Sequence, residues 1–435
     1  MREEGEMRQA VNGERLWKRL MAMAEIGATA EGGSCRQSLS DADEAGRALF
    51  LAWCEARGYG IRKDRIGNLF IRRAGRNRDA SPVMIGSHLD TQPTGGRFDG
   101  VLGVLAGLEV LETLDDAAVE TERPIDLCVW TNEEGCRFQP AMMGSGVACG
   151  MLDLEKALSA RDGAGIVLAD ELVRHEYDRE AQPNLPDADC YIELHIEQGP
   201  ILEAEAKTIG AVTGGQGIRW YEISVRGEET HAGPVPMALR KDPVPVLMHV
   251  IGLVQAIGRI DEDARCTIGR IELSPGAINV VPGRVDMTVD LRHPNEAVLE
   301  RMHRQLLDGL EALRQNHNET DIDGRLAWHS PVVTFDGVLT EAVRASARDR
   351  QLMHRDIVSG AGHDAFNLAR RVPTTMIFVP CRDGVSHNPR EYASPFDVTA
   401  GANVLLDVAL ARSSASKSLP FPDFASSGQR LIADR

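Results

Sequence analysis

The sequence lacks several features that mark common classes of protein. Its eight cysteines include no Cys-x-x-Cys pair, so a zinc knuckle is not expected, and scattered single cysteines are typical of reduced thiols inside a cell. No apolar run approaches the roughly 20 residues that a membrane span needs, and the N-terminal segment MREEGEMRQAVNGERLW has acids and no apolar signal region. The net charge of −17 argues against nucleic-acid binding, which favours a basic face. We therefore expect a soluble cytoplasmic protein that binds neither membranes nor nucleic acid.

The 435 residues are too many for one ordinary hydrophobic core, and the pattern of the sequence changes along the chain. Up to about residue 212, buried apolar runs alternate with helical patterns, which predicts an α/β sheet. From 213 to 330 the expected order is β-α-β-β-α-β, and its strands alternate apolar and polar residues as in a half-exposed antiparallel sheet. We predict a main domain of residues 1–212 and 331–412, an inserted α+β domain of residues 213–330, and a Ser/Pro-rich C-terminal tail of residues 413–435.

Local patterns predict the elements of the first part of the chain. Amphipathic helices are expected over residues 12–30 and after Ser40 and Asp41, either of which would cap the second helix. Three buried strands are expected in SPVMIGSHLD, PIDLCVWTNEE and DCYIELHIEQGPILE, and a buried helix, VLGVLAGLEVLETL, directly after Gly100. Because open α/β sheets bind ligands at the C-terminal ends of their strands, the polar residues that end these runs are the functional candidates.

Several of these residues have side chains suited to a two-metal hydrolase. His88 ends the first run, Asp99 follows the glycine-rich loop TGGRFDG, and Glu133 and Glu134 end the second run. In such a centre one carboxylate bridges two cations, His and Glu complete their coordination, and a spare glutamate takes the proton of the attacking water. Strand alternation turns Asp90 to the side of His88, so we expect its carboxylate to accept the second imidazole N–H. Each residue alone is more often a solvated or capping group, whereas the ordered set is more specific.

Six segments of the chain together resemble one known family. They are GSHLDTQPTGGRFDGVLGVLAGLEVL, TNEEGCRFQPAMMGSG, LHIEQGPILE, GEETHAGPVPM, INVVPGRVDMTVDLRHP and AGHDAFNLARRVPTTMIFVPCRDGVSHNP. They look like the N-carbamoyl-amino-acid amidohydrolases, which include N-carbamoyl-L-amino-acid hydrolase, β-ureidopropionase and allantoate amidohydrolase. This family is a branch of the dinuclear metallopeptidases that also hold aminoacylases. The resemblance spans about Glu14 to Asp407 and implies a metallopeptidase-like catalytic domain, with a mixed sheet flanked by helices, and an inserted lid and dimerisation domain.

The resemblance implies a role for each residue of the centre. Five residues match the family's metal ligands: His88, Asp99, Glu134, His195 and His387. Asp99 matches the bridging aspartate, and His195 stands where the peptidase cousins generally have a carboxylate. Glu133 matches the general base. The family binds two divalent ions, commonly Zn²⁺, Mn²⁺, Co²⁺ or Ni²⁺, and a set of His and carboxylate ligands suits all of them.

The resemblance also implies how a carboxylate-bearing ureido substrate is bound. Arg292 matches the residue that binds the carboxylate, and an Arg fork suits that planar group. His231 matches the histidine that stabilises the oxyanion, and Gln198 and Asn279 match side chains that hydrogen-bond the substrate. His363 belongs to a loop whose backbone is expected to line the pocket. Since the inserted domain pairs subunits in the family, we predict a homodimer.

The expected reaction is hydrolysis of the carbamoyl C–N bond of an N-carbamoyl-amino acid, of the L-α or β-alanine type, to the amino acid, CO₂ and ammonia. Three alternatives stay open. Allantoate amidohydrolase is the first, and an aminoacylase or dipeptidase is the second, against which His195 counts. The third is a binding protein on the same fold, against which Glu133 counts, because binding alone needs no spare acid beside a metal-bound water.

Overall fold

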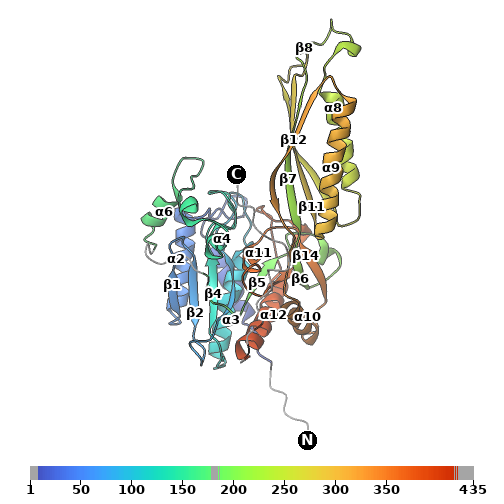
Figure 1. Ribbon diagram of the computed structural model, residues 1–435. Coiled ribbons are helices and arrows are strands. Elements are labelled where there is room, and N and C mark those ends of the chain that lie inside the picture. Colours follow the sequence, from blue (N-terminus) through green and yellow to red (C-terminus); the bar gives the residue numbers. More distant parts are fainter. Residues whose placement is uncertain (1–7, 178–184, 186, 416, 418, 420–435) are drawn as a thin grey trace. The chain divides into compact units, whose positions relative to one another are not determined.

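The computed structural model describes residues 8–177, 185, 187–415, 417 and 419 (Figure 1). The described residues up to Thr213 and from Thr334 onward form a first compact unit, and Gly214–Val333 form a second. No helix in the described part of the chain is long and apolar enough to cross a bilayer.

The first unit is built on a mixed sheet. Its strands are β1 (Gly60–Lys63), β2 (Leu69–Arg73), β3 (Val83–His88), β4 (Ile125–Trp130), β5 (Cys190–Ile196), β6 (Ile209–Gly215), β13 (Val333–Thr334), β14 (His354–Ser359) and β15 (Thr374–Val379). Their order is β1-β2-β4-β3-β5-β15-β6-β13, with β14 paired to β6, and β4, β3, β5 and β15 are mutually parallel. These four parallel strands are buried along their whole length, as expected for a sheet covered on both faces.

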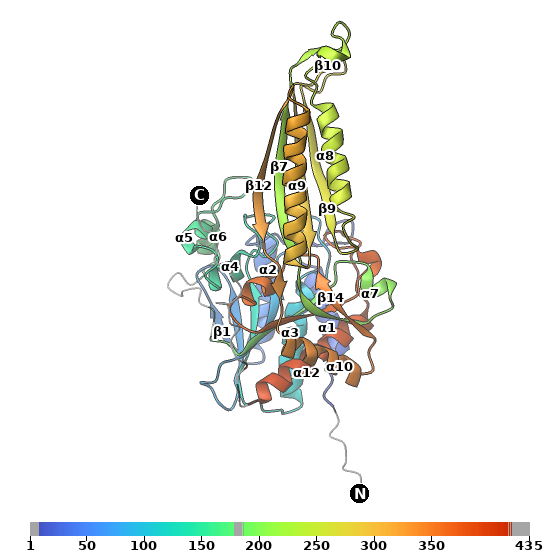
Figure 2. The same ribbon diagram turned by 45° about the vertical axis from the view of Figure 1, so that its right-hand side comes forward.

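Helices cover both faces of this sheet (Figures 1 and 2). They are α1 (Gly13–Ala24), α2 (Asp41–Glu55), α3 (Val101–Asp116), α4 (Met143–Ala148), α5 (Leu154–Leu158), α6 (Leu168–Arg174), α7 (Ile201–Ala204), α10 (Gly337–Asp349), α11 (Asp364–Leu368) and α12 (Pro395–Ser414), with a 3₁₀ turn at Arg382–Gly384. Helices α1, α3, α10 and α12 pack together on one face, and α11 lies on the other. Successive residues of β5 point to opposite faces of the sheet. Leu194 lies against Gly401 of α12 on one face, and the Glu193 carboxylate accepts a hydrogen bond from Ala365 N of α11 on the other.

Three helix ends test the sequence patterns. Helix α2 is capped as predicted, by Ser40, whose side chain accepts from Asp43 N. The prediction of helix over residues 25–30 is wrong: α1 ends at Ala24 because the chain turns back at Gly27, where φ is 74° and a Cβ would lie 2.5 Å from the Cys35 carbonyl oxygen. Helix α12 runs to Ser414, so the segment predicted as tail begins as helix. Beyond it, only residues 415, 417 and 419 are among the described residues.

The second unit is an α+β fold. Its elements are β7 (Gly217–Arg226), β8 (Thr230–His231), a 3₁₀ turn (Met237–Leu239), α8 (Val244–Ile257), β9 (Arg265–Ser274), β10 (Val280–Val281), β11 (Arg284–His293), α9 (Glu296–Asn316) and β12 (Asp321–Ser330). The antiparallel sheet has the order β12-β7-β11-β9, and β8 pairs with β10 in a separate ribbon. Helices α8 and α9 pack on one face of the sheet around a core of alternating apolar residues. The predicted fold class, an α/β protein with a mixed sheet flanked by helices, is confirmed.

Candidate metal centre

The predicted metal ligands of the first unit lie where its parallel strands end. His88 is the last residue of β3, and His195 is the last but one of β5. Glu133 and Glu134 follow the end of β4, and Asp99 stands two residues before α3. Because β3, β4 and β5 are neighbouring parallel strands, these residues meet at one edge of the sheet.

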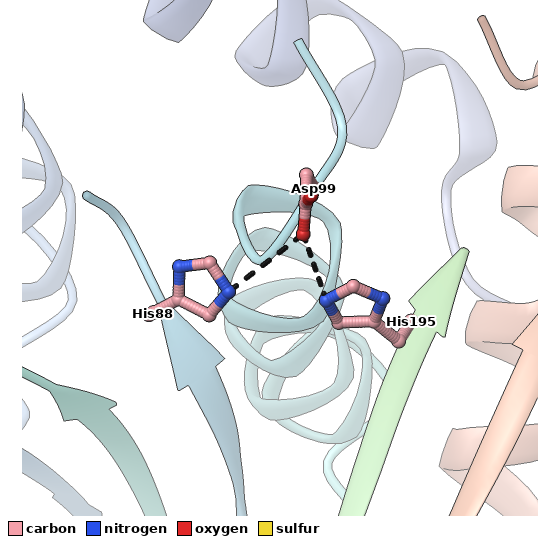
Figure 3. A group of neighbouring side chains, drawn as sticks. All are labelled: His88, Asp99 and His195. Atoms are coloured by element: carbon pink, nitrogen blue, oxygen red, sulfur yellow. Dashed lines mark ion pairs between the residues drawn. The ribbon is translucent and has the colours of Figure 1, made fainter. Parts of the chain in front are cut away.

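Three of the side chains form a buried group (Figure 3). Asp99 Oδ1 lies 3.1 Å from His195 Nε2 and 3.8 Å from His88 Nε2. Two ligands bound to the same tetrahedral ion at about 2.1 Å are themselves about 3.4 Å apart. The spacing of this group therefore suits a divalent metal ion.

A second group shares Asp99. His387 Nε2 lies 3.3 Å from Asp99 Oδ2 and 3.4 Å from Glu134 Oε2. The two oxygens of Asp99 thus face different histidines, as in a carboxylate that bridges two ions. The His387 side chain is 50% exposed and its backbone has φ of 52°, whereas Glu134 is 5% exposed.

The two strand histidines are held in the tautomer that metal binding requires. His88 Nδ1 lies 3.0 Å from the backbone carbonyl of Asp90, and His195 Nδ1 lies 2.9 Å from that of Ile196. A carbonyl can only accept, so both Nδ1 atoms carry the proton and both Nε2 atoms present a lone pair. Both Nε2 lone pairs are directed toward the Asp99 carboxylate. The two imidazoles and the carboxylate therefore offer donor atoms that fit a metal centre.

The contact of Asp90 differs from the predicted one. Its carboxylate Oδ1 is 3.9 Å from His88 Nδ1, beyond hydrogen-bond distance, and it is the backbone carbonyl that accepts. The carboxylate instead accepts from the backbone N–H groups of Glu133 and Glu134, each at 3.3 Å. Asp90 therefore positions His88 through its main chain and the glutamate pair through its side chain.

Gly100 permits the approach of Asp99 to the histidines. Its φ is 68°, and a Cβ there would lie 2.3 Å from His88 Cε1. Its N–H group lies 3.2 Å from His195 Nε2. A side chain at this position would push the His88 ring out of place.

The carboxylates of this centre are crowded. Burial raises the pKa of Glu133 well above its usual range, and the nearby Asp364, Glu134 and Asp90 add to the effect. Burial and the charge of Asp99 raise the pKa of Glu134 to about 8. Several buried acids that disfavour each other's ionisation need a cation to be charged together. The electrostatics therefore agree with the ligand geometry.

Gln198 and three residues that sequence patterns did not mark support the same centre. Gln198, predicted to bind substrate, donates to Asp99 Oδ2 at 2.8 Å. Gln92 donates to Glu134 Oε2 at 2.7 Å, and Ser386 donates to Asp99 Oδ2 at 3.0 Å. Glu391 accepts from the Asp99 N–H at 3.1 Å. Gln92 is close in sequence to His88, but no pattern distinguishes Ser386 or Glu391 from ordinary loop residues.

His363 is more closely involved than expected. Its ring centroid lies 4.5 Å from that of His195, and its Nε2 lies 3.0 Å from Ser359 Oγ. Together with Glu193 it forms a further buried group of ligand-type atoms around His195. The side chain of this loop, in addition to its backbone, therefore belongs to the surroundings of the centre.

The other predicted substrate-binding residues lie in the second unit. His231 and Asn279 are neighbours, since His231 pairs with Val280 across the β8–β10 ribbon and Asn279 O accepts from Ala232 N. Arg292 lies near the end of β11, and its Nε and Nη2 donate to Asp290 Oδ2 at 3.0 and 2.8 Å.

Most of the chain matches a known protein family. Residues 84–411 match Peptidase family M20/M25/M40. The chain belongs to this family. The predicted class of enzyme, a hydrolase acting on linear amide C–N bonds, is thereby also confirmed.

Several relatives and solved structures are similar over nearly the whole chain. An N-carbamoyl-L-amino-acid amidohydrolase of Rhizobium meliloti is 44% identical, over 93% of this chain and 97% of its own. An allantoate amidohydrolase of Bacillus subtilis is 32% identical, over 89% and 94%. The crystal structure of an amidase of the hydantoinase/carbamoylase family from Burkholderia multivorans is 49% identical with a TM-score of 0.89, over 93% of this chain and 99% of that one.

Proposed function

We propose that this protein hydrolyses N-carbamoyl-amino acids to the amino acid, CO₂ and ammonia. The observation that carries the proposal is the buried Asp99 carboxylate, whose two oxygens face histidines from different segments of the chain. The proposed ligands of two divalent ions are His88, Asp99 and His195 for the first and Asp99, Glu134 and His387 for the second. Zn²⁺ or Mn²⁺ suits these nitrogen and carboxylate donors. The relatives named as N-carbamoyl-L-amino-acid amidohydrolases support the choice of substrate.

The proposed reaction uses Glu133 as the proton carrier. Divalent ions bound here would polarise the carbamoyl oxygen and lower the pKa of water from 15.7 toward about 7. Glu133 Oε2 lies 3.5 Å from His88 Nε2, so this carboxylate stands beside the ligand group. It takes a proton from the attacking water and gives it to the leaving amine. The carbamic acid released decomposes to CO₂ and ammonia.

Arg292 is proposed to bind the substrate carboxylate. Asp290 fixes the plane of its guanidinium through Nε and Nη2. A guanidinium held in this way loses little rotamer freedom when it binds a planar anion. A fork of this shape matches the two oxygens of the substrate carboxylate.

The second unit supports the proposal of a homodimer. Arg292 pairs with Ile218, near the first residue of β7. His231 is in β8, which follows the last residue of β7, Arg226. At about 3.3 Å per residue these ends are roughly 25 Å apart. A carbamoyl amino acid is much shorter, so Arg292 and His231 of one chain cannot both contact it. We therefore propose that His231 and Asn279 act on the substrate of a second copy, with His231 stabilising the oxyanion.

Exposed apolar side chains near β8 and β10 agree with a surface covered in a dimer. They are Met237, Leu239 and Ile278. Sedimentation of the holoenzyme would test this part of the proposal.

Allantoate hydrolysis is the second candidate. Its support is the 32% identity to allantoate amidohydrolases of Bacillus subtilis and Escherichia coli. Allantoate also carries a carboxylate and ureido groups, so the same metal ligands and Arg292 could bind it. The side chain of the substrate is what separates the two candidates.

Metal content and ammonia release test the function together. Purified enzyme is expected to hold two divalent ions per chain and to release ammonia from an N-carbamoyl-L-amino acid, with N-carbamoyl-β-alanine and allantoate as comparison substrates. Glu133→Gln is expected to keep the metals and lower kcat by about 10² to 10⁴-fold, because the proton carrier is removed. Turnover near the wild-type rate in this variant would reject the role of Glu133.

A further inference from the structure

Two tryptophans of the second unit are unusually exposed. Trp220 on β7 and Trp328 on β12 are 44% and 42% exposed, whereas Trp130 is fully buried. Their rings are in contact, with centroids 4.6 Å apart and an interplanar angle of 40°. Burying side chains of this size is worth about 2 kcal/mol or more each, so a pair left in solvent calls for a ligand or partner.

A bulge in β12 brings the two rings to the same face. Leu326 pairs with Tyr221, whose hydroxyl contacts His303 of α9, so both lie on the helix-covered side of the sheet. With regular alternation Trp328 would follow Leu326 to that side. The register instead shifts between Leu326 and Trp328, and Trp328 pairs with Trp220. The bulge therefore moves Trp328 to the open face of the sheet.

Arg292 lies beside this pair on the same face. Along β11 the buried residues Val289 and Leu291 alternate with the half-exposed Asp290 and Arg292. Asp290 pairs with Trp220, and Arg292 is one pleat further along, opposite Ile218. Diagonal neighbours of this kind have Cα atoms about 7 to 8 Å apart, within reach of long side chains. A guanidinium fork and an aromatic surface are thus adjacent on one sheet.

An ion pair bounds the other side of the tryptophans. Arg325 of β12 pairs with Glu222 of β7 across the next position of the open face. The two indole rings therefore lie between this ion pair and the Asp290–Arg292 pair. An apolar surface of two side chains flanked by charged groups suits the substituent of a small molecule better than the long apolar face of a helix or a second sheet.

We propose that Trp220 and Trp328 bind the side chain of the substrate and select N-carbamoyl-amino acids with an aromatic or large apolar side chain. The inference rests on the proposed function, in which Arg292 binds the carboxylate of the same molecule. In an α-amino acid the side chain and the carboxylate are bonded to the same carbon atom. Binding groups for the two, the tryptophan pair and Arg292, are therefore expected to lie side by side, as they do here. Allantoate and N-carbamoyl-β-alanine have no apolar side chain and gain nothing from the pair.

The test compares two substrates in matched variants. Trp220→Ala and Trp328→Ala are assayed with N-carbamoyl-L-phenylalanine and N-carbamoylglycine, and Leu273→Ala, which removes an exposed apolar side chain near the far end of the same sheet, is the control. We expect kcat/KM for the phenylalanine substrate to fall about 10 to 100-fold in each tryptophan variant, mainly through KM. The glycine substrate should change less than about threefold, and the control should match the wild type with both. An equal loss for both substrates, or no loss, would overturn the inference.

A binding measurement separates this inference from the proposed function. In the Glu133→Gln background, N-carbamoyl-L-phenylalanine is expected to change tryptophan fluorescence, and the change should disappear when Trp220 and Trp328 are both replaced by leucine. If the wild type releases ammonia from neither carbamoyl substrate, the proposed function is wrong. If it hydrolyses both and the substrate ratio is the same in the tryptophan variants, only the present inference is wrong.

Discussion

The two proposed metal positions share Asp99 and differ in how the chain holds their other ligands. His88 and His195 come from neighbouring buried strands, and each side chain is 1% exposed. Their Nδ1 atoms donate to backbone carbonyls one or two residues away. At the other position, His387 comes from a loop, is half exposed and has a left-handed backbone conformation.

The difference suggests a rigid position and an adaptable one. Strand pairing between β3 and β5 fixes His88 and His195 before any ion binds. A half-exposed loop residue such as His387 is held by fewer buried contacts and opens more easily. We therefore expect the ion at the His88 and His195 position to bind tightly and the ion at the His387 position to exchange readily.

The largest expected effect is the loss of the metal ions from both positions together. Asp99→Asn removes the shared charge, so the enzyme should lose both ions and kcat should fall about 10³-fold or more, since bound metals supply several kcal/mol of stabilisation to the transition state. Elemental analysis and ammonia release measure the two outcomes. Asp116→Asn, at the exposed end of α3, is the matched control and should retain metals and rate. If Asp99→Asn keeps one ion at full occupancy, Asp99 does not bridge.

Paired histidine variants should separate the two positions. His88→Ala is expected to empty the buried position and to abolish turnover, because it removes the imidazole donor that the end of β3 holds in place. His387→Ala should lose one ion and about 10 to 100-fold in kcat/KM, with partial recovery at millimolar metal, since the exposed position can still accept water as a ligand. Equal metal affinity in the two variants would remove the proposed distinction.

Sequence patterns identify the rigid position better than the adaptable one. Long buried runs predict β3, β4 and β5, and the polar residues at their ends then follow from the direction of a parallel sheet. His88, Asp99 and the glutamate pair are found in this way from the residues alone. His387 lies eight residues beyond the end of β15, outside the short segment that ends the buried run, and its role came only from the family resemblance.

Contacts between distant segments were the part that patterns could not supply. Helix α3 reads as apolar on nearly all sides, yet its Glu109 and Glu112 are fully buried and pair with Arg15 and Arg19 of α1, more than 90 residues earlier. The approach of His363 to His195 likewise joins segments far apart in the chain. Periodicity marks which face of an element is buried, but it does not name the partner on that face.

Gly100→Ala tests whether the buried position is as rigid as its geometry indicates. The new Cβ would meet the His88 ring at 2.3 Å, and the residue would be strained at φ of 68° by about 1 to 3 kcal/mol. We expect a fall of about 10²-fold in kcat with lower occupancy of the first ion and a lower Tm. Gly163→Ala, in open space on the same unit, is the control and should behave as the wild type. An unchanged rate in Gly100→Ala would mean that the strand-end position can adjust, and the contrast with His387 would weaken.

The smallest expected effect concerns the support of the adaptable position. Gln92 Nε2 donates to Glu134 Oε2 at 2.7 Å and so restrains the ligand opposite His387. Removing a hydrogen bond to a ligand typically lowers metal affinity about 10 to 100-fold, and Gln92→Ala should therefore weaken the second ion while the first stays bound. Titration of the chelated enzyme with Zn²⁺ measures the two affinities, and Gln92→Glu sharpens the result, because a carboxylate beside Glu134 cannot donate and repels it. If both variants weaken the first ion as much as the second, the two positions are coupled through Asp99 and do not differ in rigidity.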